Sequence, residues 1–174
     1  MKKHIRSKKS QAGFTVIEAM IAIVIGLVVV GAAVALSGDG TRSSRVQGEV
    51  TGLGQLFSQV PNLRSNSGYG PNGTNLVPAL RQNRAIPAQI SDSGTTLSNK
   101  WGGPITVTSN GFGYVVTTGG LPPEGCAGVV QRLSGSALAT SINGGAAITG
   151  EVTSAVATAQ CGNASNTLTF TSHN

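Results

Sequence analysis

Gly13-Phe14-Thr15-Val16-Ile17-Glu18 opens the apolar stretch around which the rest of this chain is organised. The stretch runs from Phe14 to Leu36, and in these 23 residues only Thr15 and Glu18 are neither apolar nor small. A helix that rises about 1.5 Å per residue would be roughly 35 Å long here, enough to cross a hydrocarbon core of about 30 Å. Glu18 is the exception within it, because a carboxylate at mid-bilayer costs about 2.5–3.5 kcal/mol and calls for a partner.

Five basic residues and no acid precede this stretch: Lys2, Lys3, Arg6, Lys8 and Lys9. A cleaved secretory signal matches poorly, because its apolar region has about 7–15 residues and ends at a small-x-small cleavage site. A plain membrane anchor agrees with the length and with the basic flank on the cytoplasmic side. It leaves Glu18 and the order Gly13-Phe14 without an explanation.

A third interpretation accounts for all of these features. The order of basic leader, Gly13, aromatic Phe14, Glu18 and a long apolar run resembles the N-terminus of type IV pilins. In that family a prepilin peptidase cuts after the glycine and methylates the new N-terminus. The resemblance implies cleavage between Gly13 and Phe14, N-methylation of Phe14, and a role for Glu18 in subunit assembly, where its carboxylate faces a terminal amine.

The net charge of +6 comes mostly from the leader. Five of the twelve basic residues lie there, which leaves seven against six acids in the rest of the chain. The leader charge therefore sets topology and holds the N-terminus in the cytoplasm. No nucleic-acid partner is predicted, because the remaining basic residues are scattered rather than gathered in a patch.

Charged residues make up only 10% of the chain, which also contains 25 glycines. This neutral composition suits an extracellular β-rich domain that packs against copies of itself; a loop-rich secreted domain is the alternative. In an exported domain Cys126 and Cys161 can form a disulfide, whereas two unrelated buried thiols are the other possibility. Such a bridge would close a loop of about 35 residues and stabilise the domain by roughly 3–4 kcal/mol.

Beyond the apolar stretch the sequence predicts that the helix continues. Apolar residues recur every three or four positions and define one face: Val46, Val50, Leu53, Phe57 and Val60. Four polar residues are expected off this face: Gln47, Glu49, Gln55 and Gln59. No proline precedes Pro61, so we predict one long helix from Phe14 to about Pro61, loosest around 37–40.

The second half of the sequence predicts short strands and short helices. Two β-type runs, 104–108 and 112–117, flank the hairpin signal Asn110-Gly111. Pro122-Pro123-Glu124 is typical of a helix start, and it predicts a helix to about Leu133 that carries Cys126 in its first turns. The other segments are predicted as loops over 62–75 and 91–103, a short helix over 76–84, β-structure over 146–157 and a last strand over 167–171.

This layout resembles the type IVb subclass, which includes bundlin, the toxin-coregulated pilin and the thin-pilus pilin of conjugative plasmids. The resemblance lies in Lys100-Trp101-Gly102-Gly103, the hairpin, the helix bearing Cys126, and Cys161 just before a terminal strand. The short leader and Phe14 look more like type IVa. The implied fold is α+β, a long N-terminal helical spine packed against a small antiparallel β-sheet with a disulfide-closed C-terminal region. The implied organisation is a cleaved leader (1–13), a transmembrane and assembly segment (14–36) and an extracellular pilin domain (37–174).

The sequence contains no recognisable motif of catalytic residues. The two histidines are His4, in the leader, and His173, near the end, which gives a Ser-His-Asp or Cys-His arrangement little to work with. Two cysteines without a nearby histidine do not make a zinc site. We expect no enzyme activity, no cofactor and no metal, and we expect Trp101 to be a packing residue rather than a ligand platform.

The resemblance implies a structural function: a pilus subunit, expected to be the major one, for adhesion, aggregation or conjugative contact. Its implied partners are copies of itself, the prepilin peptidase, the inner-membrane assembly machinery, an outer-membrane secretin and a host or recipient cell surface. The protein would wait in the inner membrane and then enter an extracellular pilus. A pseudopilin of a type II secretion system is one alternative, although the acidic calcium loop common in that group is missing, since Glu151 is the only acid after Glu124. A membrane-anchored extracellular binding domain is the other.

Overall fold

A helix leads into the part of the chain that the computed structural model describes, residues 40–172. It is α-helical over residues 40–59 and tightens into the 3-10 helix η1 (Val60–Leu63), which has Pro61 in its first turn. The predicted helix end near Pro61 is confirmed. The predicted helix over 14–36 lies outside the described residues.

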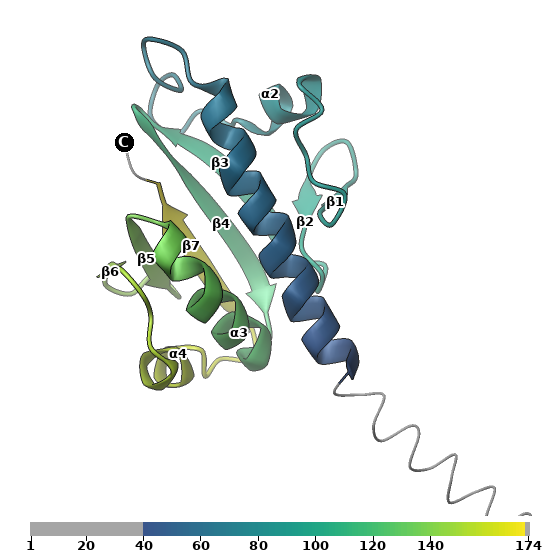
Figure 1. Cartoon of the computed structure of the whole chain (residues 1–174), viewed down its shortest axis with the longest axis vertical. Helices are drawn as coiled ribbons and strands as arrows, with labels where there is room; N and C mark the ends of the chain where they lie inside the picture. The colour runs from purple at the N-terminus through teal and green to yellow at the C-terminus, as the bar shows by residue number, and fades with distance from the viewer. Residues whose placement is uncertain (1–39, 173–174) are drawn as a thin grey trace, which may run out of the picture. The chain divides into compact units, whose positions relative to one another are not determined.

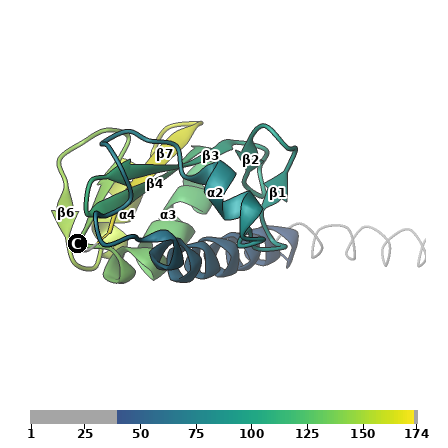
Figure 2. The same cartoon turned by 90° about the horizontal axis from the view of Figure 1, so that it is seen from above.

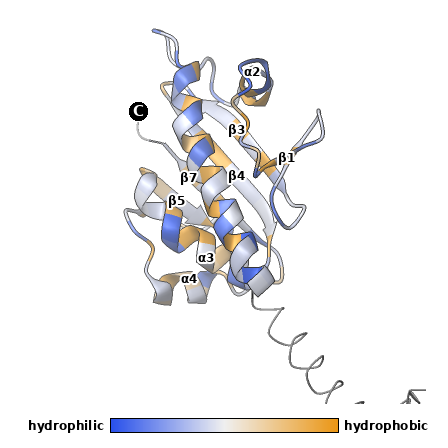
Figure 3. Ribbon diagram, turned by 45° about the vertical axis from the view of Figure 1, so that its right-hand side comes forward, coloured by the Kyte–Doolittle hydropathy of each residue, from blue (hydrophilic) through white to orange (hydrophobic). Residues whose placement is uncertain are grey.

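One face of this N-terminal helix is buried, and Figure 3 shows hydrophobic and hydrophilic segments alternating along it. Val46, Leu53 and Val60 are buried, and Val50 and Phe57 pack partly buried against the core, as predicted. Two further residues share the buried face: Leu56, which is fully buried, and Glu49, which is only 1% exposed. The expectation that Glu49 points away from the core is therefore wrong.

The helix lies against a seven-stranded sheet with the order β1-β2-β3-β4-β7-β5-β6, in which every neighbouring pair is antiparallel (Figure 1). Its strands are β1 (Ser91–Asp92), β2 (Leu97–Ser98), β3 (Pro104–Asn110), β4 (Gly113–Leu121), β5 (Ala139–Ile142), β6 (Ile148–Thr149) and β7 (Asn166–Thr171). The predicted last strand is β7, and it inserts between β4 and β5. The last strand of the chain therefore joins β1–β4 to β5 and β6 in one sheet.

The hairpin of β3 and β4 is confirmed, but its turn lies one residue later than predicted. Asn110 pairs with Gly113, so the two turn residues are Gly111 and Phe112. Gly111 has a φ of +77°, as the first central position of a type II′ turn requires, and glycine adopts it without strain. Phe112, predicted as the start of a strand, is instead 57% exposed in the turn.

Three other segments differ from the expectations. The region 91–103 contains two short strands, β1 and β2, and strand β5 was not predicted. The predicted β-structure over 146–157 is reduced to β6, and the helix α4 (Ser154–Gln160) follows it. The alternating Thr and Val residues led to the wrong prediction of a strand over this segment. Helix α4 also contains three alanines, and alanine has the best helix propensity.

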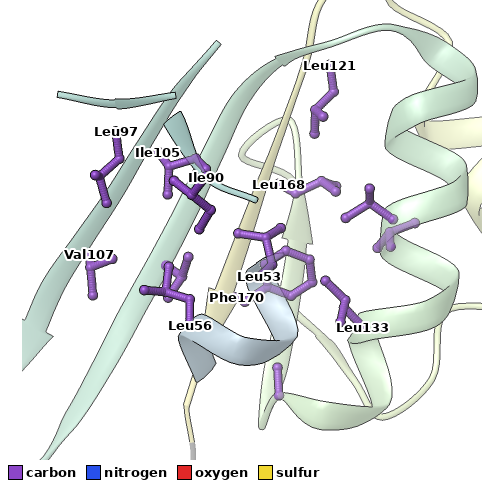
Figure 4. Packing of buried hydrophobic residues seen from close by; sticks show 14 of the residues in the cluster. Leu53, Leu56, Ile90, Leu97, Ile105, Val107, Leu121, Leu133, Leu168 and Phe170 are labelled. Carbon is purple, nitrogen blue, oxygen red and sulfur yellow. The ribbon is translucent and has the colours of Figure 1, made fainter. Parts of the chain in front are cut away.

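Two helices cover the same face of the sheet. Figure 2 shows the N-terminal helix and α3 (Pro123–Leu133) on one side of the strands. The short helix α2 (Val77–Gln82), predicted over 76–84, contacts η1 and β3, and the 3-10 helix η2 (Ser134–Ser136) follows α3. Figure 4 shows the core between these layers, where Leu53 and Leu56 meet side chains of the sheet and of α3. The predicted α+β fold class is confirmed.

Candidate assembly site

The residues with an implied role in processing and assembly lie outside the described range. These are Gly13, Phe14 and Glu18, and the apolar segment 14–36 lies outside it as well. Among the described residues, none of the helices has the length and apolarity needed to cross a membrane. The described part of the candidate site consists of the helix over residues 40–59 and the elements packed on it.

Helix α3 approaches the N-terminal helix closely at a glycine. A Cβ atom added at Gly128 would lie 2.8 Å from Cγ1 of Val46, so this contact leaves no room for a side chain. One turn further along, the guanidinium Nη1 of Arg132 donates a hydrogen bond of 2.8 Å to Oε1 of Gln47. The two helices therefore form one surface layer with a fixed spacing.

Glu49 fixes the same helix to the loop before β3. Its Oε2 accepts a 3.0 Å hydrogen bond from the backbone N–H of Lys100, while its Oε1 is buried without a hydrogen-bond partner among the described residues. Burial raises the pKa of this carboxyl above its ordinary value, and the N–H and charge of Lys100 partly offset the rise. The carboxyl thus shifts toward the neutral form relative to an exposed glutamate.

The loop that receives Glu49 is held rigid by Asn99. The Asn99 amide Nδ2 donates to Oγ1 of Thr118 at 3.0 Å and to the carbonyl of Gly119 at 2.7 Å. Its Oδ1 accepts from the N–H groups of Trp101 and Gly103, each at 2.9 Å. A buried amide with all of these bonds satisfied fixes a unique loop geometry.

Trp101 packs as predicted. Its partly buried ring lies against the hydrophobic core, and a Cβ atom added at Gly125 would lie 2.9 Å from the ring. The indole therefore covers the start of α3 and connects the loop after β2 to that helix.

The predicted disulfide between Cys126 and Cys161 is present, with the two Cα atoms 5.7 Å apart. It joins the first turns of α3 to the C-terminal end of α4, and both cysteines are buried. A 35-residue separation makes the bridge a substantial constraint on the unfolded chain. It holds together the region that contains η2, β5, β6 and α4.

No group of three potential metal ligands occurs among residues 40–172. The most strongly perturbed phenol is Tyr114, where burial, with a smaller contribution from Tyr69, raises the pKa to about 12. Its hydroxyl donates to the carbonyl of Phe57 at 3.0 Å. Tyr114 therefore joins the N-terminal helix to the sheet.

Two family models match the chain. The model described as PilS N terminal matches residues 43–173, well over half of the 174 residues. The chain belongs to this family. The model described as the prokaryotic N-terminal methylation motif matches residues 8–34. Together the two matches make the chain a type IV pilin, as the sequence resemblance implied.

A pilin of this kind is a structural subunit. The methylation motif implies a membrane-anchored precursor that a prepilin peptidase processes. No curated protein matches this pilin. The assignment to subclass IVb stays a prediction.

Sequence reasoning missed three residues that shape this pilin domain. Glu49 lies three positions after Val46 and four before Leu53, so helical spacing alone would have placed it on the buried face. Phe112 follows a glycine that can occupy the first position of a type II′ turn, which was a readable signal. Asn99 carried no comparable signal, because the two groups to which its buried amide donates are 19 and 20 residues away.

Proposed function

We propose that this type IV pilin is the major subunit of a type IVb pilus. The precursor is inserted in the inner membrane with its leader, residues 1–13, in the cytoplasm. The prepilin peptidase cuts after Gly13 and methylates Phe14. Residues 14–36 then form the filament core, and residues 37–174 form the extracellular domain.

The observation that carries the proposal is the order of the two matched regions. A methylation motif over 8–34 directly precedes a pilin domain over 43–173 with a disulfide suited to an oxidising compartment. The inner-membrane assembly machinery would build the filament, an outer-membrane secretin would conduct it, and a host or recipient cell surface would receive it.

Glu18 has a specific role in this proposal. Cleavage creates an amine at Phe14, and in low-dielectric surroundings an amine and a carboxylate attract more strongly than in water, although desolvation offsets part of the gain. The Phe14 amine of an incoming subunit pairs with Glu18 of a neighbour and sets the axial register. An unpaired buried charge costs about 3–5 kcal/mol, and this cost disfavours the addition of a subunit that lacks the pair.

The substitution Glu18→Ala tests this role. The variant should be inserted and cleaved like the wild type but should form few filaments, as counted by electron microscopy of sheared cell-surface material. Glu18→Asp should be intermediate, because its shorter side chain reaches the amine poorly. Glu151→Ala removes an exposed carboxylate of the folded domain and is the matched control, with filaments in wild-type number. Normal filament number and length in processed Glu18→Ala would disprove the register role.

A further inference from the structure

The turn between β3 and β4 presents an aromatic side chain to solvent. Phe112 is 57% exposed, and Leu138, at 39%, is the other exposed large hydrophobic residue among those described. The turn is well fixed: the carbonyl of Gly111 accepts from the N–H of Tyr69 at 2.9 Å, and the N–H of Gly111 donates to Oγ of Ser109 at 3.0 Å. Phe112 is therefore exposed on a rigid support.

A hollow lies where α3 begins and α4 ends, and we call it the α3–α4 hollow. It measures about 270 Å³ and is lined by Pro123, Glu124, Ala127, Thr158, Cys161 and Gly162. It is slightly smaller than the roughly 300–1,000 Å³ of ordinary small-molecule sites. The Cys126–Cys161 disulfide holds its two helices together. A hollow of this size and lining suits one large apolar side chain.

The turn and the hollow lie at opposite ends of the domain. Strand β4 begins just after the turn and ends at Leu121, two residues before α3. Its nine residues span about 30 Å of extended chain. Figure 1 shows the β3–β4 turn at the upper end of the domain, and α4 with the start of α3 at the lower end. A chain therefore cannot place Phe112 in its own hollow.

Charge at the two ends is complementary. Arg64 is exposed and lies five residues before Tyr69, whose N–H donates to the carbonyl of Gly111 in the turn. Its charge partly offsets the rise in the pKa of Tyr69 that burial causes. Glu124 is exposed on the rim of the hollow and is its one charged lining residue. One end thus offers an aromatic side chain beside a cation, and the other an apolar hollow beside an anion.

We propose that Phe112 of one subunit inserts into the α3–α4 hollow of the next copy, with Arg64 facing Glu124 across the contact. Such a contact joins two different surfaces of identical chains, so it builds a ring or an open helical filament and cannot close as a two-fold dimer. The proposed filament function selects the helical case. This inference rests on the proposed filament function and adds to it a contact between the folded domains. A central aromatic anchor with a charged rim is also the arrangement found at well-packed interfaces.

Paired single variants test the anchor. Phe112→Ala should lower the number of filaments at least tenfold, while the melting temperature of the detergent-solubilised, unassembled pilin and cleavage after Gly13 stay at wild-type values. Leu138→Ala removes the other exposed hydrophobic side chain and should leave filaments unchanged. Ala127→Leu, which fills the hollow from inside, should reproduce the defect of Phe112→Ala.

A charge reversal and a cross-link identify the partner surface. Arg64→Glu and Glu124→Arg should each reduce filament number severalfold, and the double variant should restore it. A photoreactive benzoylphenylalanine at position 112 should cross-link, in assembled filaments, to peptide 122–127 or 158–162 of a second subunit.

The outcomes separate the two proposals. Wild-type filaments together with normal assembly of Phe112→Ala, or with cross-links to some other surface, would overturn the contact and leave the filament function intact. A wild-type chain that is not cut after Gly13 and forms no filament would overturn the filament function, and the contact would fall with it.

Discussion

Glu49 is an acidic residue that is buried on the same helix face as Val46 and Leu53. One of its oxygens binds the backbone N–H of Lys100, and the other has no partner among the described residues. A charged group in this setting is costly, so burial is the largest effect on its pKa and raises it. The proton is therefore held more tightly in the folded domain than in the unfolded chain.

This difference in proton affinity between the folded and unfolded states makes the stability of the domain depend on pH. The contribution of a carboxyl with a raised folded-state pKa is fully present below the unfolded pKa, near 4.5, and is lost as pH rises through the folded-state value. We therefore predict that the wild-type domain becomes less stable as pH rises from about 4.5, and that Glu49→Gln flattens this part of the profile. Urea unfolding at a series of pH values measures it. The exposed Glu151→Gln should keep the wild-type profile, and a Glu49→Gln profile parallel to wild type would contradict the assignment.

At the scale of elements, the closest contact between helices depends on Gly128. A methyl group there meets the β-branched side chain of Val46, which cannot turn aside easily because its χ1 is restricted. Gly128→Ala should destabilise the domain by about 1–3 kcal/mol through overpacking, seen as a lower midpoint in urea. Gly40→Ala, where no atom lies within 4 Å of an added Cβ, is the control and should not lower stability. Equal midpoints for the two variants would refute the close packing.

The disulfide acts on a set of elements that have little core of their own. Strands β5 and β6 and helix α4 are short, with four, two and seven residues. We predict that Cys161→Ser lowers the free energy of unfolding by about 3–4 kcal/mol and reduces surface filaments. Native, unreduced pilin should show no free thiol on labelling. Labelling of both cysteines without a denaturant would contradict the bridge.

Elements with a strong local signal could be predicted from the sequence. Pro122-Pro123-Glu124 indicated the start of α3, the apolar spacing indicated the described helix, and the short run before the C-terminus indicated β7. Strand β5 could not be predicted reliably, because it is defined by its pairing with the distant strand β7, in which Thr140 lies opposite Phe170, and not by its own composition. The turn residue Phe112 was misplaced by one position, because the hairpin register depends on which residue takes the positive φ.

The N-terminal motif anticipated the family match, whereas sequence reasoning missed features that tertiary packing decides. The roles of Gly13, Phe14 and Glu18 stay predictions. The ordered motif at Gly13, Phe14 and Glu18 is by itself typical of a prepilin, and the match over 8–34 agrees with it. Burial of Glu49 followed from tertiary packing that overrides the usual exposure of charged residues. The α3–α4 hollow is formed by residues from two helices, and β4 places Phe112 at the other end of the domain. Neither feature could be predicted from the local sequence.

At the scale of the whole molecule, the proposed function makes processing and assembly depend on a short N-terminal motif. Gly13 has no side chain to obstruct a membrane peptidase, so Gly13→Val should block cleavage. Cells that produce this variant should accumulate the full-length precursor, seen as a slower band on denaturing gels, and should lack filaments. Gly31→Val, a glycine inside the apolar stretch, is the control and should still be cleaved. Cleavage of Gly13→Val at the wild-type rate would contradict the assigned bond.

The most direct test of the account is the intact mass of the protein in purified filaments. We predict one species that begins at Phe14, carries one methyl group on its N-terminus and lacks two hydrogens through the Cys126–Cys161 disulfide. Fragmentation of that species should locate the methyl group on Phe14. Filament protein that still contains Lys8 and Lys9, or a filament fraction without this chain, would contradict the conclusion that the chain is a processed pilus subunit.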